Sequence, residues 1–173
     1  MLKFEPNISF DSVKMLEYVE GIGMALHCHH YLGGFQKMVD LVDYVDGAKI
    51  MYQSGERIIH NQLSNYFKSH PQVALPLDRL EVAADAVRKF GLGVLDFAQC
   101  TDKGGTVTVP TSHVAKVLKE KIGKTDKPGG YLTAGLIAGI LSSVYDKPVG
   151  AFEVSEQSTF ADGKDTIVYK VEV

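Results

Sequence analysis

The sequence predicts an α+β fold in which N-terminal helices pack on an antiparallel sheet of about four strands. Two observations support this prediction. In the first half of the chain, apolar residues recur at intervals of three and four, the period of one helix face. From Leu92 onward they alternate in short runs bounded by glycine and proline, as in strands joined by turns. A chain of 173 residues with 45% hydrophobic content is long enough for one such domain with an N-terminal extension.

The charge balance argues against some classes of protein. The chain carries 18 basic and 21 acidic residues and has a pI near 6.0, whereas nucleic-acid binders are usually basic. No window approaches the roughly 20 apolar residues of a membrane span, and the N-terminus has no apolar signal core. Two distant cysteines, Cys28 and Cys100, do not make a disulfide framework. We therefore expect a cytoplasmic protein with no nucleic-acid or membrane partner.

The first predicted helix begins at Asp11 or Ser12, either of which is a suitable cap, and ends at Gly47 after Asp46. One apolar stripe runs along it, formed by Val13, Leu16, Val19, Met24, Cys28, Tyr31, Phe35, Met38 and Val42. A pair of glycines at positions 21 and 23 weakens this helix and is expected to kink or divide it.

Two further helices are predicted before the sheet. The second covers Ala48–Phe67, and the pattern then breaks at His70-Pro71 and Leu75-Pro76. Asp78 is the expected cap of the third helix, Arg79–Phe90, which Gly91 terminates.

The first hairpin of the sheet follows directly. Leu92–Thr101 is predicted as a strand, Asp102–Gly105 as the turn and Thr106–Val109 as the returning strand, which Pro110 ends.

A short helix, capped by Thr111 or Ser112, is then expected to reach Ile122, and a polar loop spans Gly123–Gly130. The next helix, Tyr131–Tyr145, is apolar and rich in Gly, Ala and Ser. Small residues either let this helix pack tightly or leave a cavity that holds a small hydrophobic ligand.

Two strands, Val149–Ser158 and Thr166–Val173, are predicted around a turn at Ala161–Lys164. In the last strand, Ile167, Tyr169, Val171 and Val173 share one face, and Thr166, Val168, Lys170 and Glu172 share the other. One buried face and one partly solvent-exposed face are typical of an antiparallel sheet.

The densest cluster of reactive side chains is His27-Cys28-His29-His30-Tyr31. At about 100° per residue these five side chains cannot converge on one point. In the predicted helix Cys28 and Tyr31 lie in the apolar stripe, His27 lies at its edge and His29 points the opposite way. Cys28 is then either a small buried hydrophobe or a nucleophile with His27 or His60 as its base.

His27 and His30 stand three residues apart, so on a helix they could share a metal ion with ligands from elsewhere. The spacing of the other histidines and acids nominates no further ligand. Alternatively, both are surface or interface histidines.

A second face of the first helix also favours contact with a partner. Its members are Gly23, His27, His30, Gly34 and Leu41, and Ile22 and Leu26 widen it. A helix that is apolar on two faces is usually buried on two sides, which predicts a homodimer as well as a core. The alternative is burial within one chain. The glycine pairs lack the strand–loop–helix context of a phosphate loop, so nucleotide binding is not indicated and no cofactor is identified.

Several segments from Asp46 to Val173 carry a family resemblance through their order and spacing: Tyr52–Glu56, Lys89–Phe97, Gly129–Leu141, Lys147–Val149 and Phe152–Val154. They resemble the 4-vinyl reductase family, a small-molecule- or hydrocarbon-binding domain also related to trafficking-complex subunits. The resemblance implies a ligand-binding domain of the type found in nitric-oxide signalling and Golgi transport. It also implies dimerisation through an N-terminal helical segment, here residues 1–45, and a mostly apolar cavity between helices and sheet.

The sequence departs from this family at its metal site. Members often bind zinc through cysteines before the small-residue helix and in the last hairpin. Here those positions read Pro128–Gly130 and Glu156–Asp165, with no cysteine, so no family zinc site is expected.

The leading functional hypothesis is a dimeric domain that binds or senses a small hydrophobic or aromatic molecule. Its cavity is predicted to be lined by His27, Cys28, Tyr31, Phe35, His60 and Phe97. One alternative is a metal- or thiol-dependent enzyme that uses the His27–His30 cluster, with Cys28 and His27 as catalytic residues. Another is a scaffold subunit with no ligand.

Overall fold

A computed structural model of the chain describes residues 2–25, 27–121, 129–158 and 166–173. The elements along this part are β1 (Ile8–Asp11), β2 (Leu16–Val19), β3 (Ile22–Met24), α1 (His29–Leu41), α2 (Gly47–Ser69), α3 (Pro76–Lys89), β4 (Gly93–Thr101), β5 (Gly104–Ser112), α4 (His113–Lys121), α5 (Tyr131–Val144), β6 (Glu153–Ser158) and β7 (Ile167–Glu172).

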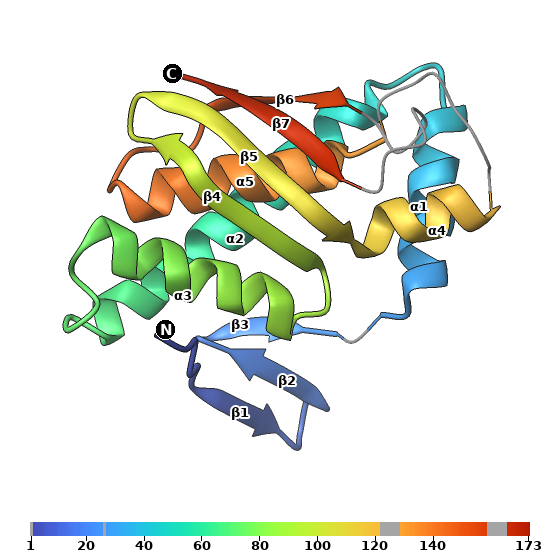
Figure 1. Cartoon of the computed structure of the whole chain (residues 1–173). Coiled ribbons are helices and arrows are strands. Elements are labelled where there is room, and N and C mark those ends of the chain that lie inside the picture. Colours follow the sequence, from blue (N-terminus) through green and yellow to red (C-terminus); the bar gives the residue numbers. More distant parts are fainter. Residues whose placement is uncertain (1, 26, 122–128, 159–165) are drawn as a thin grey trace.

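The predicted α+β class and the antiparallel four-stranded sheet are confirmed. The sheet has the order β4-β5-β7-β6, and every neighbouring pair is antiparallel. Helices α2 and α5 cover one face of the sheet, and α3 lies beside β4 (Figure 1). The alternation predicted for the last strand is also present, because Ile167, Tyr169 and Val171 are buried while Lys170 and Glu172 are exposed. This buried face holds the helices on the sheet.

The long N-terminal helix was a wrong prediction. Residues 8–24 instead form a separate three-stranded sheet, β1-β2-β3, at one end of the molecule (Figure 1). Asp11 does bind backbone N–H groups, those of Val13 and Lys14, but it does so in the turn between β1 and β2. Gly21, with φ 77°, provides the left-handed backbone of the next turn. The apolar spacing in this region therefore arises from short strands separated by turns.

Helix α1 is consequently short, and α2 begins where the first helix was expected to end. Asp46 is the N-cap of α2, and its carboxylate accepts a hydrogen bond from the N–H of Lys49 at 2.9 Å. Gly47 is the first residue of α2 rather than a terminator, because an Asp cap starts a new helix there.

Two prolines were also misread. Pro76 was expected to lie in the break before the third helix, but it is the first residue of that helix, at a position where a missing N–H costs nothing. Asp78 lies in its first turn instead of capping it. Pro110 does not end β5, because β7 pairs with β5 only as far as Val109. Beyond that residue β5 is an edge strand, where proline is tolerated.

Ser112 caps α4 as one of the two predicted candidates, since its hydroxyl accepts a hydrogen bond from the N–H of Ala115. The final sheet strands match two predicted segments, although β6 begins only at Glu153. Most of the predicted loop at 123–130 and the turn at 161–164 lie outside the described residues.

The small residues of α5 serve close packing on α2. A Cβ atom on Gly135 would overlap the carbonyl oxygen of Tyr52, and one on Gly139 would overlap that of Glu56. Of the two readings of this helix, tight packing is therefore the correct one. The same contact places the C-terminal end of α5 beside the middle of α2.

The N-terminal strand segment is attached to the main body by side chains. Phe4 is 1% exposed and packs on Tyr66, with ring centroids 4.7 Å apart. The amide of Gln62 in α2 lies 3.2 Å from the sulfur of Met24 in β3. These contacts bring Ile22 of β3 to the C-terminal half of α2. None of the described helices is long and apolar enough to cross a membrane.

Candidate functional site

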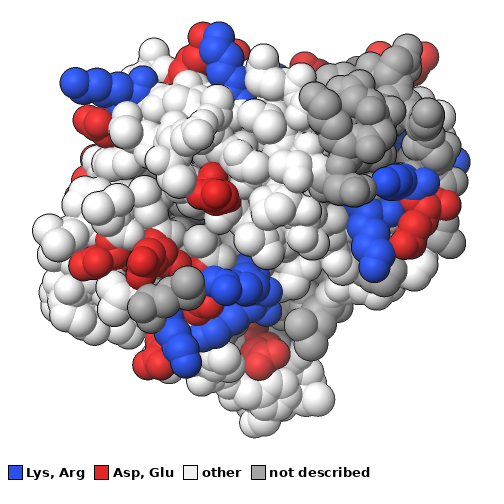
Figure 2. Space-filling model, viewed as in Figure 1, with Lys and Arg blue, Asp and Glu red and all other residues white. Residues whose placement is uncertain are grey.

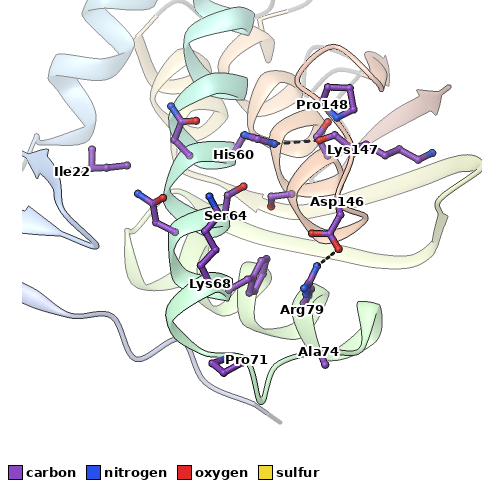
Figure 3. Close-up of a pocket in the computed structure, with 15 residues that line it drawn as sticks. Ile22, His60, Ser64, Lys68, Pro71, Ala74, Arg79, Asp146, Lys147 and Pro148 are labelled. Carbon is purple, nitrogen blue, oxygen red and sulfur yellow. Dashed lines mark hydrogen bonds and ion pairs between the residues drawn. The ribbon is translucent and has the colours of Figure 1, made fainter.

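A groove of about 880 Å³ runs along the C-terminal half of α2. Its other walls are the start of α3, the end of α5 and the turn that follows α5, and Ile22 closes the side towards β3 (Figure 3). The lining includes apolar surface from Phe67, Pro71 and Ala74 and polar groups from each helix. Small-molecule sites typically combine apolar walls with a few converging polar groups.

His60, a residue predicted to line the ligand cavity, lies in this groove. Its Nε2 is 3.3 Å from the carbonyl oxygen of Lys147, in the turn after α5. A carbonyl oxygen only accepts hydrogen bonds, so Nε2 carries the hydrogen and Nδ1 of the neutral ring is an acceptor. Nδ1 is buried and has no hydrogen-bond partner within the described part of the chain.

Two adjacent serines of α5 line the same groove but differ in their bonding. The hydroxyl of Ser143 donates to the carbonyl of Ile140 at 3.0 Å, which is a common arrangement for serine inside a helix. The hydroxyl of Ser142 is fully buried and has no partner among the described residues. The groove therefore contains a second buried polar atom without a hydrogen bond.

Arg79 is held rigidly at the other end of the groove. Its Nε donates to the carbonyl of Val73, and its Nη1 donates to the carbonyl of Val144 and to Asp146, the last at 2.8 Å. The guanidinium also lies 5.0 Å from the centre of the Phe67 ring. These contacts join the start of α3 to the end of α5.

The turn after α5 positions both Asp146 and Lys147. Asp146 adopts a left-handed conformation, with φ 52°, directly after the helix, and the N–H of Lys147 donates to the carbonyl of Ser142 at 2.8 Å. This bond is characteristic of a Schellman C-cap, in which glycine is the usual left-handed residue. Here an aspartate occupies that position and its carboxylate binds Arg79.

The other predicted lining residues do not lie in this groove. Cys28 is the exposed N-cap of α1, and its side chain makes no capping hydrogen bond. The rings of His27 and Tyr31 stack with centroids 4.6 Å apart, and Tyr31 is 56% and Phe35 44% exposed. Because α1 starts at His29 and not near Asp11, the apolar stripe drawn through Cys28 does not form.

Phe97 lies elsewhere, in β4, where it is buried. It contributes to a separate groove of about 620 Å³ between α3 and β4. The predicted set is therefore divided among the surface of α1, the groove along α2 and the edge of the main sheet.

The glycine contacts of α1 are also different from the prediction. A Cβ on Gly33 would overlap the side chain of Val117 in α4, so α1 approaches α4 within the same chain. Gly34 faces open space, and Gly23 belongs to β3. The continuous second face expected on one long helix is absent because the helix itself is divided.

No group of three or more His, Cys, Asp and Glu side chains in the described part of the chain could hold a metal ion; the side chain of His29 lies outside that part. At the place of the family zinc site, Oε2 of Glu156 instead accepts a hydrogen bond from the N–H of Gly130 at 2.9 Å. The described residues there do not fit zinc. Elsewhere, burial raises the pKa of the Cys100 thiol to about 11, so this thiol stays protonated at neutral pH.

Sequence reasoning identified His60 but missed Ser142, Arg79 and Lys68. One available signal was the recurrence of His60, Ser64 and Lys68 at every fourth position of α2, which places polar groups on one face. No comparable pattern in the sequence pointed to Ser142 of α5, since a serine in an apolar helix is compatible with ordinary packing.

No family model and no curated protein matches the chain. A search of solved structures finds the phenol-responsive sensory domain of the transcription activator PoxR, solved with phenol. Its TM-score is 0.73 at 14% identity, over 95% of this chain and 83% of that chain. At this identity the match shows the fold alone, and it is consistent with the α+β class of this chain.

Two further matches have TM-scores of 0.49. A vinyl-4-reductase family protein from Methanocaldococcus jannaschii is 14% identical, over 83% of this chain and 90% of that chain. A trafficking protein particle complex subunit 3 from Naegleria fowleri, covalently bound to palmitic acid, is 10% identical, over 83% and 93%.

Proposed function

We propose that this chain is a small-molecule-sensing domain and that its ligand binds in the groove along α2. The observation that carries the proposal is the presence in one groove of two buried polar atoms, Nδ1 of His60 and Oγ of Ser142, that have no partner among the described residues. More than 90% of buried polar groups in proteins are hydrogen-bonded, and leaving one unpaired costs about 1–3 kcal/mol. A ligand that pairs them removes this cost.

The two atoms also define the polar group of the ligand. Nδ1 of His60 needs a donor, and the hydroxyl of Ser142 both donates and accepts. A hydroxyl group on the ligand meets both needs, because it can donate to His60 and accept from Ser142. The apolar surface of Phe67, Pro71 and Ala74 suits a hydrocarbon body. Phenol, with which the similar sensory domain was solved, combines these two features.

We also propose that the domain acts as a cytoplasmic homodimer. The exposed side of α1 carries Tyr31, Phe35, Met38 and Leu41, which are 44–75% exposed. Four large apolar side chains on one helix face form the kind of patch that usually marks a protein interface. Both cysteines are free thiols, as suits a reducing compartment.

The binding proposal is tested with phenol, benzyl alcohol and cyclohexanol, by thermal shift and isothermal titration calorimetry. We expect at least one of them to raise Tm. We expect Ser142→Ala and His60→Gln each to weaken that binding about tenfold, the effect of losing one hydrogen bond. Ser143→Ala is the matched control, because the Ser143 hydroxyl already bonds to Ile140.

The proposal is wrong if none of these alcohols binds. It is also wrong if an alcohol binds equally well to the wild type and to both groove variants. Native mass spectrometry of the purified protein checks the result independently, since it reports any retained organic ligand and the number of subunits together.

A further inference from the structure

The charges along the groove suggest more about the ligand than its hydroxyl group. Three basic side chains and one acidic side chain line the groove, namely Lys68, Arg79, Lys147 and Asp146. The whole chain, in contrast, has a net charge of −3. A concentration of positive charge in a hollow of an acidic protein favours an anionic ligand.

Lys147 contributes little to this field inside the groove. Its Nζ donates to the carbonyl of Asp102 at 2.8 Å and lies 4.7 Å from the centre of the Phe152 ring. Its side chain points away from the other groove residues (Figure 3). The cations available to a ligand are therefore Lys68 and Arg79.

Lys68 and Arg79 lie at the same end of the groove, and His60 lies towards the other end (Figure 3). Lys68 forms no ion pair within the residues that the structure describes. Arg79 uses Nε and Nη1 for its protein contacts, which leaves the two N–H groups of Nη2 for a ligand. Since those contacts already fix the guanidinium, binding a carboxylate costs it little conformational entropy.

The net charge at the Lys68 and Arg79 end of the groove matches a ligand with a single negative charge. The carboxylate of Asp146 lies 2.8 Å from Arg79 and balances one of the two cations. One positive charge remains, which matches a carboxylate better than a doubly charged phosphate.

We infer that the ligand of this groove is a small organic monocarboxylate with a hydroxyl group at its opposite end, held by Lys68 and Arg79 at the carboxylate and by His60 and Ser142 at the hydroxyl. This inference rests on the proposed function and specifies its ligand class. On the face that Figure 2 shows, basic and acidic side chains are intermingled.

The test compares 4-hydroxybenzoate, benzoate and phenol as probes in isothermal titration calorimetry at low salt. We expect 4-hydroxybenzoate to bind at least tenfold more tightly than phenol. Added salt should weaken the binding of 4-hydroxybenzoate and benzoate but not the binding of phenol. We expect Lys68→Met to weaken the binding of 4-hydroxybenzoate about threefold to tenfold and to leave the affinity for phenol unchanged. Lys49→Met is the control, because it removes the same charge from the start of the same helix.

The outcomes separate the two proposals. If phenol and 4-hydroxybenzoate bind equally and Lys68→Met has no effect, the carboxylate inference is wrong and the proposed function stands. If Lys68→Met weakens the binding of the carboxylates but Ser142→Ala and His60→Gln do not change their affinity, the role given to His60 and Ser142 is wrong. The carboxylate-binding role of Lys68 then stands. If no probe binds to the wild-type protein, both are wrong. Lys68 is preferred to Arg79 for this test because it is exposed and its replacement removes no described contact within the fold.

Discussion

The imidazole of His60 donates from Nε2 to the carbonyl oxygen of Lys147 across a distance of 3.3 Å. This contact joins the middle of α2 to the turn after α5, and it orients the ring so that Nδ1 remains an acceptor. One side chain thus has a structural contact on one nitrogen and an unused acceptor on the other.

The roles of the two ring nitrogens of His60 can be tested separately by mutation. Gln reaches the position of Nε2 with an amide N–H, whereas Asn places its polar atoms near Nδ1. We expect His60→Gln to keep stability near that of the wild type and His60→Asn to lower the free energy of unfolding by about 0.5–1.5 kcal/mol, the net value of one hydrogen bond. Urea denaturation measures both. Equal stability of the two variants would contradict the role given to Lys147.

Because α5 packs closely on α2, adding a single methyl group between the two helices should lower the stability of the protein. Gly139→Ala places a methyl group against the carbonyl oxygen of Glu56, and we expect a loss of about 1–3 kcal/mol from overpacking. Gly34→Ala is the control, because nothing lies within 4 Å of its new methyl group. There we expect a gain of up to about 1 kcal/mol from helix propensity. Thermal or urea unfolding should show opposite signs for the two.

Asp85 anchors the N-terminal segment and makes stability depend on pH. Burial alone would raise the pKa of this carboxyl, but a hydrogen bond from the N–H of Phe4 at 2.9 Å and the nearby Lys89 and Arg88 lower it below its ordinary value. A lowered folded-state pKa contributes stability above the unfolded pKa of about 3.9, and this contribution is lost as pH falls through the folded pKa.

We therefore expect Asp85→Asn to destabilise the protein by about 1–2 kcal/mol at neutral pH, the value of a charge-assisted hydrogen bond. The difference from the wild type should shrink as the pH falls below about 4. Urea denaturation over a pH series measures this. A difference that stays constant down to strongly acidic pH would show that the ionised carboxylate is not responsible.

The exposed side of α1 predicts the effect of a charge on association. We expect Met38→Glu to shift the mass measured by light scattering from twice 18.9 kDa towards 18.9 kDa, because a carboxylate would be desolvated in the interface. Lys103→Glu places the same side chain in the exposed turn between β4 and β5, on the opposite side of the molecule from α1 (Figure 1), and should leave a dimer intact. A wild-type protein that is monomeric at high concentration would overturn the dimer proposal.

Hydrophobic periodicity predicted helix α2 and the main sheet closely, since each has a long pattern with one buried face. Helix α5 was predicted from its continuous apolar run instead, and it is buried on nearly every side. Periodicity failed between residues 8 and 24, where strands of three and four residues are too short to distinguish alternation from helical spacing. Cys28, Tyr31 and Phe35 had been grouped on one stripe of the long N-terminal helix, of which the structure forms only His29–Leu41.

By itself the sequence determined the α+β class, the antiparallel main sheet and the capping of α4 by Ser112. These features depend on local spacing and on side chains near one another in the chain. Only the tertiary structure decided that His60 and Ser142 line one groove, that Arg79 is held by Asp146, and that the small residues of α5 are used for packing. Such contacts join residues more than 60 positions apart, and helix–helix packing brings them together, which no local pattern records.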